Sequence, residues 1–294
     1  MGKRFPGPGE HEPTASLWVG EAAVAEYVTC PEVDSRRGPR PYLHPVRTLA
    51  GTVVTDVQPE DHPHHLGVSV AMQDVSGANL WGGRTYVRGQ GYTWRDDHGR
   101  IEHDAWLDRA PDRLANRMRW CAPDGRALLV EDREVTAASI DDRAWLMRFS
   151  YALTNTGSRP VTLGSPATNG RPGKAGYGGF FWRLAPGHPE VFDPVADTEA
   201  EVNGSAAEWV AAVGGAPDRP YTLVFWGLGD GDRWFVRAAE YPGVCVALAF
   251  TEVRVIEPGA SLRRTHRIAI VDGALDRRGV IEMLGAAGHP APTA

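Results

Sequence analysis

Asp61, His62, His64 and His65 lie within one short segment of the sequence, Asp-His-Pro-His-His. Imidazole is the side chain best suited to proton transfer near neutral pH. Pro63 favours extended geometry at His62, and in an extended segment His62 and His64 point to one side while His65 points to the other. Asp61 can fix the tautomer of one imidazole. The segment therefore predicts general acid–base catalysis, and the alternative is a polar loop whose histidines only cap turns.

A metal ion is not favoured at this cluster. His62 and His64 have the spacing of the histidine pair in a cupin, but a cupin also needs a glutamate a few residues later. Position 68 is Val68, and no glutamate follows before Glu102. The remaining candidate ligands are His44, His103, Glu131 and Asp61. None of them is indicated by spacing, so we expect no metal.

Glu131 is a further candidate for proton transfer, because it follows an apolar run and is expected on a strand. A glutamate that faces a histidine across a pocket forms a workable acid–base pair. The predicted catalytic residues are therefore Glu131 and the three clustered histidines. The alternative is that Glu131 or Glu134 forms an ion pair with Arg133, Arg143 or Arg148 on a solvated sheet face.

Aromatic and arginine side chains follow the histidine cluster in the sequence, at residues 79–83 and in the glycine-rich stretch 165–183. Aromatic rings stack on the C–H faces of sugars, and polar side chains bind the hydroxyl groups, which is the general form of a ligand pocket. The predicted substrate-binding residues are Arg40, Tyr42, His44, Asp61, Trp81, Arg171, Tyr177, Trp182 and Arg183. For most of the ten tryptophans the alternative, burial in the core, is preferred.

Apolar residues alternate with polar ones along most of the chain, as in half-buried antiparallel strands. The clearest runs are 101–108, 114–120, 145–153 and 262–270, and in the first of these Ile101 and Leu107 are expected to share a face. Helical periodicity is confined to 276–285. We predict an all-β fold, a two-sheet antiparallel β-sandwich with few short helices. Residues 15–285 are expected to form one domain, with flexible termini at 1–14 and 286–294.

Composition restricts the partners. The net charge of −6 disfavours nucleic acid and anionic membranes. The longest apolar run, 244–250, is too short to span a bilayer, and the first residues lack a secretory signal, so we expect a cytoplasmic protein. Three distant cysteines predict free thiols. No glycine-rich turn precedes a helix, so we expect no dependence on NAD, flavin or ATP.

Several of these segments resemble a known bacterial family. The runs 40–46, 61–67, 79–81 and 170–183, and the end of the chain from Arg237 and Pro242 to Asp272-Gly273, are similar to the PmoA-like family, often labelled "methane oxygenase PmoA". The likeness covers about residues 15 to 275. Members of this family accompany oxidoreductases of sugar catabolism, which implies a role with carbohydrates. The end of the chain, up to Asp272-Gly273, also resembles the galactose-mutarotase-like supersandwiches. Those enzymes use a histidine and a glutamate at a sugar ring.

The sequence therefore predicts a carbohydrate-processing enzyme that uses histidine acid–base catalysis on a sugar or an oxidised (keto) sugar. Epimerase, lyase and hydrolase chemistry all remain open. The alternatives are a carbohydrate-binding protein without catalysis and a metal-dependent enzyme of the same substrate class. The expected ligand is a small carbohydrate.

Overall fold

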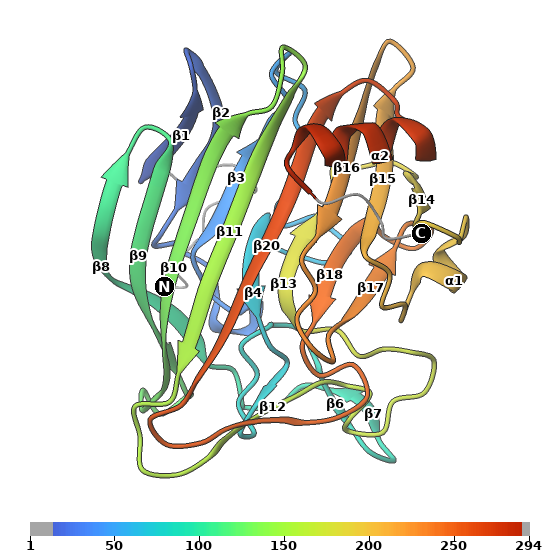
Figure 1. The fold of residues 1–294 in the computed structure, drawn as a ribbon. Coiled ribbons are helices and arrows are strands. Elements are labelled where there is room, and N and C mark those ends of the chain that lie inside the picture. The colour runs from blue at the N-terminus through green and yellow to red at the C-terminus, as the bar shows by residue number, and fades with distance from the viewer. Residues whose placement is uncertain (1–13, 290–294) are drawn as a thin grey trace.

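Two large antiparallel sheets face each other in the computed structural model, which describes residues 14–289 (Figure 1). The seven-stranded sheet has the order β1 (Ala15–Val19), β2 (Ala22–Val28), β3 (Tyr42–Val46), β4 (Val68–Ala71), β13 (Gly179–Arg183), β18 (Gly243–Ala247) and β17 (Arg233–Arg237). The eight-stranded sheet has the order β14 (Glu190–Phe192), β15 (Trp209–Ala216), β16 (Arg219–Trp226), β20 (Ser261–Asp272), β11 (Ala144–Thr154), β10 (Ala127–Ser139), β9 (Arg113–Cys121) and β8 (Arg100–Ala110). The predicted all-β sandwich is confirmed.

Smaller elements gather at one end of the sandwich, at the bottom of Figure 1. A three-stranded sheet joins β19 (Arg254–Ile256), β12 (Val161–Gly164) and β5 (Asp74–Val75), and a hairpin joins β6 (Thr85–Val87) to β7 (Gly91–Thr93). The helices are short: η1 (Ser35–Arg37), α1 (Glu199–Val202) and α2 (Arg277–Ala286). Within residues 14–289, no helix is long and apolar enough to cross a membrane.

Strand β11 shows most clearly why the alternating pattern produces the core. Trp145, Met147, Phe149 and Tyr151 are all buried, whereas Arg148 between them is exposed. Successive side chains of a strand point to opposite faces, so one face of β11 enters the space between the sheets. Fully burying such large apolar side chains contributes roughly 1.5–3 kcal/mol each.

Strand β8 departs from the predicted alternation. Its pairing with β9 shifts register between His103 and Ala105 and again between Trp106 and Asp108. A bulge inserts an unpaired residue and thereby exchanges the faces of the residues that follow it. As a result Trp106 packs against the core, and Leu107 is 51% exposed instead of sharing the buried face of Ile101.

A helix covers part of the outer face of one large sheet, and loops cover the outer face of the other. Helix α2 packs on the outer face of the eight-stranded sheet, over β15, β16 and β20, through Val280, Met283 and Leu284. Its N-cap is Asp276, whose side chain accepts a hydrogen bond from Gly279 N at 2.8 Å, so the helix predicted at 276–285 is confirmed within one residue. Loops cover the outer face of the seven-stranded sheet instead.

The two predicted flexible termini lie partly outside the described residues. Inside them, Thr14 donates its backbone N–H to Tyr27 O at 2.7 Å. At the other end, Ala286 closes α2, and His289 Nε2 lies 2.8 Å from Glu208 Oε1. The described residues of both ranges therefore contact the β-sandwich through hydrogen bonds.

Candidate active site

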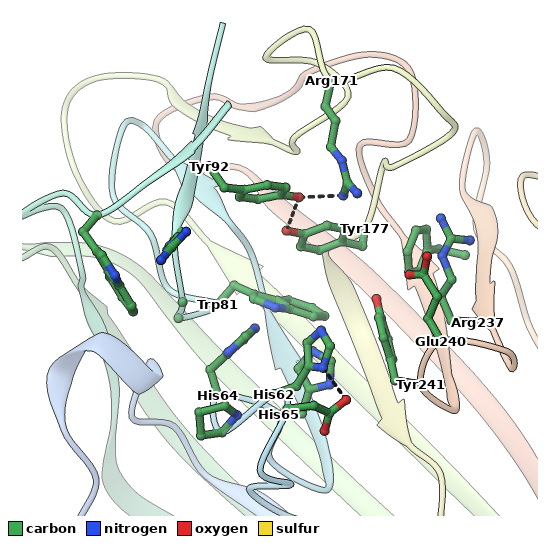
Figure 2. A pocket seen from close by; sticks show the side chains of 17 residues that line it. His62, His64, His65, Trp81, Tyr92, Arg171, Tyr177, Arg237, Glu240 and Tyr241 are labelled. Carbon is green, nitrogen blue, oxygen red and sulfur yellow. Dashed lines mark hydrogen bonds and ion pairs between the residues drawn. The ribbon is translucent and has the colours of Figure 1, made fainter. Parts of the chain in front are cut away.

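A cavity of about 380 Å³ lies over the outer face of the seven-stranded sheet (Figure 2). Its walls come from the loops after β3, β5 and β12, from the β6–β7 hairpin and from the β17–β18 turn. Seven of the thirteen site residues predicted from the sequence line it: Asp61, His62, His64, His65, Trp81, Arg171 and Tyr177. The loops of a rigid β scaffold are where binding and catalytic residues usually lie.

The histidine segment forms a turn rather than the extended chain expected from its sequence. His65 N donates to His62 O at 2.9 Å, which closes a four-residue turn with Pro63 at its second position, where proline is favoured. The turn brings all three imidazoles together. The ring of His62 stacks on that of His65 with centroids 4.7 Å apart, and His64 lies 5.7 Å from His62.

His62 is oriented by Asp61. Nδ1 of His62 lies 2.7 Å from Asp61 Oδ2, and because an ionised carboxylate only accepts, Nδ1 carries the proton and donates. Partial burial opposes the charge on Asp61, but the hydrogen bond from His62 and the nearby charges of His62 and Arg183 outweigh it and lower the pKa of Asp61. Whenever His62 is neutral, its one proton lies on Nδ1, and Nε2 can then accept a proton.

His64 is kept neutral and has no side-chain hydrogen bond within the described residues. Burial, together with the charges of His62 and Arg40, lowers its pKa to about 3. Two glycines make room for its ring. A Cβ at Gly82 would lie 2.8 Å from His64 Cβ, and a Cβ at Gly83 would lie 2.9 Å from His64 Cε1. A larger residue at Gly83 would press on the imidazole itself, whereas one at Gly82 would meet the backbone of Arg37 as well as the Cβ atom of His64.

His65 lies at the floor of the cavity and is 1% exposed. Its ring contacts the edges of Phe181 and Trp81, with centroids 4.9 Å and 5.8 Å apart. Burial, followed by the charges of His64 and His62, holds its pKa well below the usual value. Its Nδ1 is buried without a hydrogen-bond partner. His65 is therefore a neutral, packed side chain at the floor of the cavity, and its ring supports His62 by stacking.

Arg40 holds the histidine turn from behind, outside the cavity lining. Its fully buried guanidinium donates to the carbonyl oxygens of Gly38, Trp81 and His64 at 2.9–3.0 Å and to Ser69 Oγ at 3.0 Å. Five N–H donors in a fixed plane suit such a cluster of acceptors. Arg40 thus connects the two loops that carry the histidines and Trp81, and it is a positioning residue rather than a ligand contact.

The aromatic wall is built on Trp81 and Tyr177, whose ring centroids are 4.9 Å apart. Buried Asn79 fixes the turn at Trp81, because its Oδ1 accepts the backbone N–H groups of Trp81 and Gly82 at 3.0 and 2.9 Å. The hydroxyl of Tyr177 lies 3.0 Å from the hydroxyl of Tyr92, and the hydroxyl of Tyr92 lies 2.6 Å from Arg171 Nη1 (Figure 2).

Sequence reasoning missed the wall that closes the cavity opposite Trp81. The additional lining residues are Gly82, Gly83, Arg84, Tyr92, Trp94, Phe235, Arg237, Glu240 and Tyr241, besides Pro63 of the histidine turn. Tyr241 packs its ring against His62 at 4.4 Å, and Arg237 lies over Phe235 at 4.3 Å. The run Arg237 to Pro242 carried a resemblance to the PmoA-like family, and this was the one signal that could have directed attention to Glu240 and Tyr241.

Two predicted residues on β13 take positions that the strand alternation decides. Trp182 points between the sheets, where Nε1 donates to Val54 O at 3.0 Å, and it is fully buried away from the cavity. Its neighbour Phe181 points outward and underlies the cavity instead. Arg183 lies behind Tyr241, over its ring at 5.5 Å, and does not line the cavity.

Two predicted residues on β3 also lie outside the cavity. Tyr42 is buried in a small cluster with Val57 and Leu66. His44 Nδ1 lies 2.9 Å from Thr55 Oγ1, and burial lowers the pKa of His44 to about 4. Both side chains therefore stabilise the start of the histidine loop rather than contact a ligand.

Glu131 does not face the histidines. Its Oε1 accepts Arg133 Nε at 2.7 Å and its Oε2 accepts Trp120 Nε1 at 2.8 Å, and both charged side chains are 0% exposed. The alternation of β10 turns Glu131 and Arg133 into the sandwich interior. The ion pair weighed as the alternative is formed, but in the core. Glu134 pairs with Arg113 at 2.6 Å on the outer face.

The described residues include no preformed cluster of metal ligands. Among residues 14–289, no group of three or more histidine, cysteine, aspartate or glutamate side chains is placed to hold one. In the cavity the Nδ1 atom of His62 is already bound to Asp61, and His65 is packed edge-on against Phe181. The donors present suit proton transfer and hydrogen bonding to an organic ligand better than coordination.

The fold and the site define an antiparallel β-sandwich protein with a cavity on the outer face of its seven-stranded sheet. Histidines and aromatic side chains line this cavity. The chain belongs to a family of unknown function, DUF6807, which it matches over residues 14–284. No curated protein sequence matches it. The likeness to the PmoA-like family remains a resemblance.

Solved structures similar to the chain include a putative aldose 1-epimerase from Escherichia coli, at 11% identity and TM-score 0.37, over 88% of this chain and 98% of that one. An α-galactosidase from Lactobacillus brevis is similar at 10% identity and TM-score 0.38, over 69% of this chain and 33% of that one. A heparan sulfate lyase from Pedobacter heparinus follows at 8% identity and TM-score 0.29, over 60% and 22%. The chain thus spans a third or less of the last two proteins. Likeness at this level carries no conclusion about ligand or activity.

Proposed function

We propose that the protein is a carbohydrate-processing enzyme in which His62, oriented by Asp61, acts as the general base on a sugar or an oxidised (keto) sugar. The observation that carries this proposal is the 2.7 Å hydrogen bond between Asp61 Oδ2 and His62 Nδ1 at the wall of a cavity with aromatic sides. A carboxylate that holds Nδ1–H leaves Nε2 free to take a proton.

His64 supplies the complementary group. Because it is neutral, it offers one N–H donor, and a neutral imidazole can polarise a carbonyl oxygen of a ligand. With ring centroids 5.7 Å apart, His62 and His64 can reach adjacent atoms of one sugar. Nε2 of His62 would take the proton from a carbon next to a carbonyl group. The electron pair of that C–H bond would form the C=C bond of an enolate, whose oxygen accepts the hydrogen bond of His64.

The fate of the enolate decides between two reactions. If solvent protonates the carbon from its other face, the C=C electron pair forms the new C–H bond, His62 passes its proton to solvent, and the product is the epimer. If the substituent on the next carbon instead leaves with its bonding electrons and takes the proton from His62, the product is that of elimination. Trp81 and Tyr177 support a carbohydrate as the ligand, because aromatic rings that line a cavity of this size suit the C–H faces of a sugar ring.

The test is turnover of a sugar panel by the purified protein, followed by NMR. The panel contains aldoses, their uronic acids, their 6-phosphates and 3-keto glycosides. We expect at least one member to react, and His62→Gln to remove that reaction while thermal melting stays unchanged. Saturable binding of a sugar without any reaction would instead support a non-catalytic carbohydrate-binding protein.

A further inference from the structure

The lining of the cavity carries one more arginine than it carries carboxylates. Three arginines line it, Arg84, Arg171 and Arg237, against two carboxylates, Asp61 and Glu240. Asp61 is already bound by His62. Glu240 and Arg84 are both exposed, and solvent and salt screen exposed charges strongly. Arg237 lies 3.7 Å from Glu199, so Arg171 is the half-buried arginine of the lining that has no acidic partner in the described chain.

Arg171 is held in place without any carboxylate among residues 14–289. Its Nη1 donates to the hydroxyl of Tyr92 at 2.6 Å, and its guanidinium lies over the Tyr92 ring at 4.9 Å. Figure 2 shows the side chain descending from its loop toward the hydroxyls of Tyr92 and Tyr177, on the side of the cavity opposite the histidines. The Tyr92 contact uses one of five N–H donors, so the remaining donors can bind a ligand.

Arg84 in the cavity lining and Arg40 behind it also lack an acidic partner in the described chain. Arg84 lies over the ring of Trp94 at 5.8 Å and forms no ion pair. Arg40, behind the histidine turn, binds only carbonyl and hydroxyl oxygens, and burial with the charge of Arg133 lowers its pKa to about 9.

The arginines on the outer face of the eight-stranded sheet differ from Arg171, because they are paired with carboxylates. There Arg113 lies 2.6 Å from Glu134, and Arg117 lies 2.7 Å from Asp132, so the positive charges are neutralised by neighbouring strands. A second depression on that face, lined by Arg113 and Asp132, is therefore an ordinary network of surface ion pairs. The unpaired arginines at the first cavity have no such explanation.

We propose that the cavity binds a sugar that carries an acidic group, and that Arg171 is the residue that binds this group. This proposal rests on the proposed function for the sugar and adds the charge. The planar guanidinium matches both carboxylate and phosphate oxygens, often through two parallel hydrogen bonds. A sugar acid or a sugar phosphate would therefore place its anionic group at Arg171 and Tyr92, with its ring between Trp81 and the histidines.

An anionic ligand also completes the electrostatics of the site. It would compensate the charge of Arg171, which is half-buried in the cavity wall, where electrostatic interactions are stronger than in bulk solvent.

Titration calorimetry at low salt tests the proposal with matched pairs: D-glucose with D-glucuronate and glucose 6-phosphate, and D-galactose with D-galacturonate and galactose 6-phosphate. We expect at least one acidic sugar to bind about 10-fold to 100-fold more tightly than its neutral partner, as charge-assisted hydrogen bonds allow. The uronates and phosphates distinguish the two sources of the charge. Raising the NaCl concentration should reduce the advantage.

Arg171→Gln should remove that advantage. The control is Arg126→Gln, which should keep it, because Arg126 is exposed in the turn between β9 and β10 and does not line the cavity. If no acidic sugar binds more tightly than its neutral partner, or if Arg171→Gln keeps the full advantage, the proposal is wrong. Turnover of a neutral sugar that depends on His62, without any preference for acids, would overturn this inference and leave the proposed function intact.

Discussion

The carboxylate of Asp61 accepts the Nδ1–H of His62 at 2.7 Å, although the two residues are neighbours in the sequence. The contact forms because the chain turns at Pro63, so that the ring of His62 folds back over His65 at 4.7 Å. The imidazole is therefore fixed on one side by a charge and on the other by a stacked ring. Its Nε2 atom remains the free proton acceptor of the cavity.

Asp61→Asn should lower kcat about 10-fold to 100-fold with little change in KM, because the amide no longer fixes the productive tautomer of His62. The Asp61 side chain is 51% exposed, so the free energy of unfolding should change by less than about 0.5 kcal/mol. Steady-state kinetics and urea unfolding check both parts. An unchanged kcat would show that Asp61 does not orient the base.

Gly83→Ala should lower kcat because the new Cβ would lie 2.9–3.1 Å from three atoms of the His64 ring. The control is Gly89→Ala, where φ is also positive, +77° against +70°, but nothing lies within 4 Å of the new Cβ. Both variants should lose about 1–2 kcal/mol of stability from the left-handed backbone. Only Gly83→Ala should lose activity, and equal kinetics in the two variants would contradict the role of His64.

Acid should destabilise the protein through His64. Its folded pKa of about 3 lies below the unfolded value of 6.5, so below pH 6.5 the unfolded chain binds a proton that the folded chain does not. This contribution is present above pH 6.5 and is lost as the pH falls toward 3. His64→Gln should reduce the slope of unfolding free energy between pH 6 and 4 by up to about 1.4 kcal/mol per pH unit. Urea unfolding at several pH values measures this slope, with exposed His188→Gln as the control; an unchanged slope for His64→Gln would contradict it.

Glu131→Gln separates the structural role of this residue from the catalytic role first predicted for it. Breaking a buried ion pair leaves Arg133 uncompensated, which should cost about 3–5 kcal/mol of stability. The kcat of the folded fraction should stay within about twofold of the native value. Loss of kcat without loss of stability would instead return Glu131 to the catalytic machinery.

The sequence was informative where a local rule decides the structure. Alternation predicted β11, and the composition of residues 61–65 predicted a cavity wall. It failed where the outcome depends on the tertiary structure. The bulges of β8 exposed Leu107, and the turn at Pro63 gathered three histidines that an extended chain would separate. Trp182 shows the same limit, because alternation does not say which face of a strand is outward.

The missed residues share a physical reason. Tyr92, Trp94 and Tyr241 lie in hairpins that are distant from the histidines in the sequence, and only the arrangement of the strands brings them to the cavity. Nothing in their local sequence differs from the many aromatic residues that fill the core.

Deuterium incorporation tests the central claim most directly, namely that His62 removes a proton from a carbon of the ligand. The sugar that reacts in the panel is incubated with the protein in D₂O, and its C–H signals are followed by NMR. We expect loss of one C–H signal with the native protein and at least a 100-fold slower loss with His62→Gln, consistent with the usual contribution of about 10²–10⁴ from a general base. Equal exchange with the two proteins, or a reaction without any exchange, would contradict it.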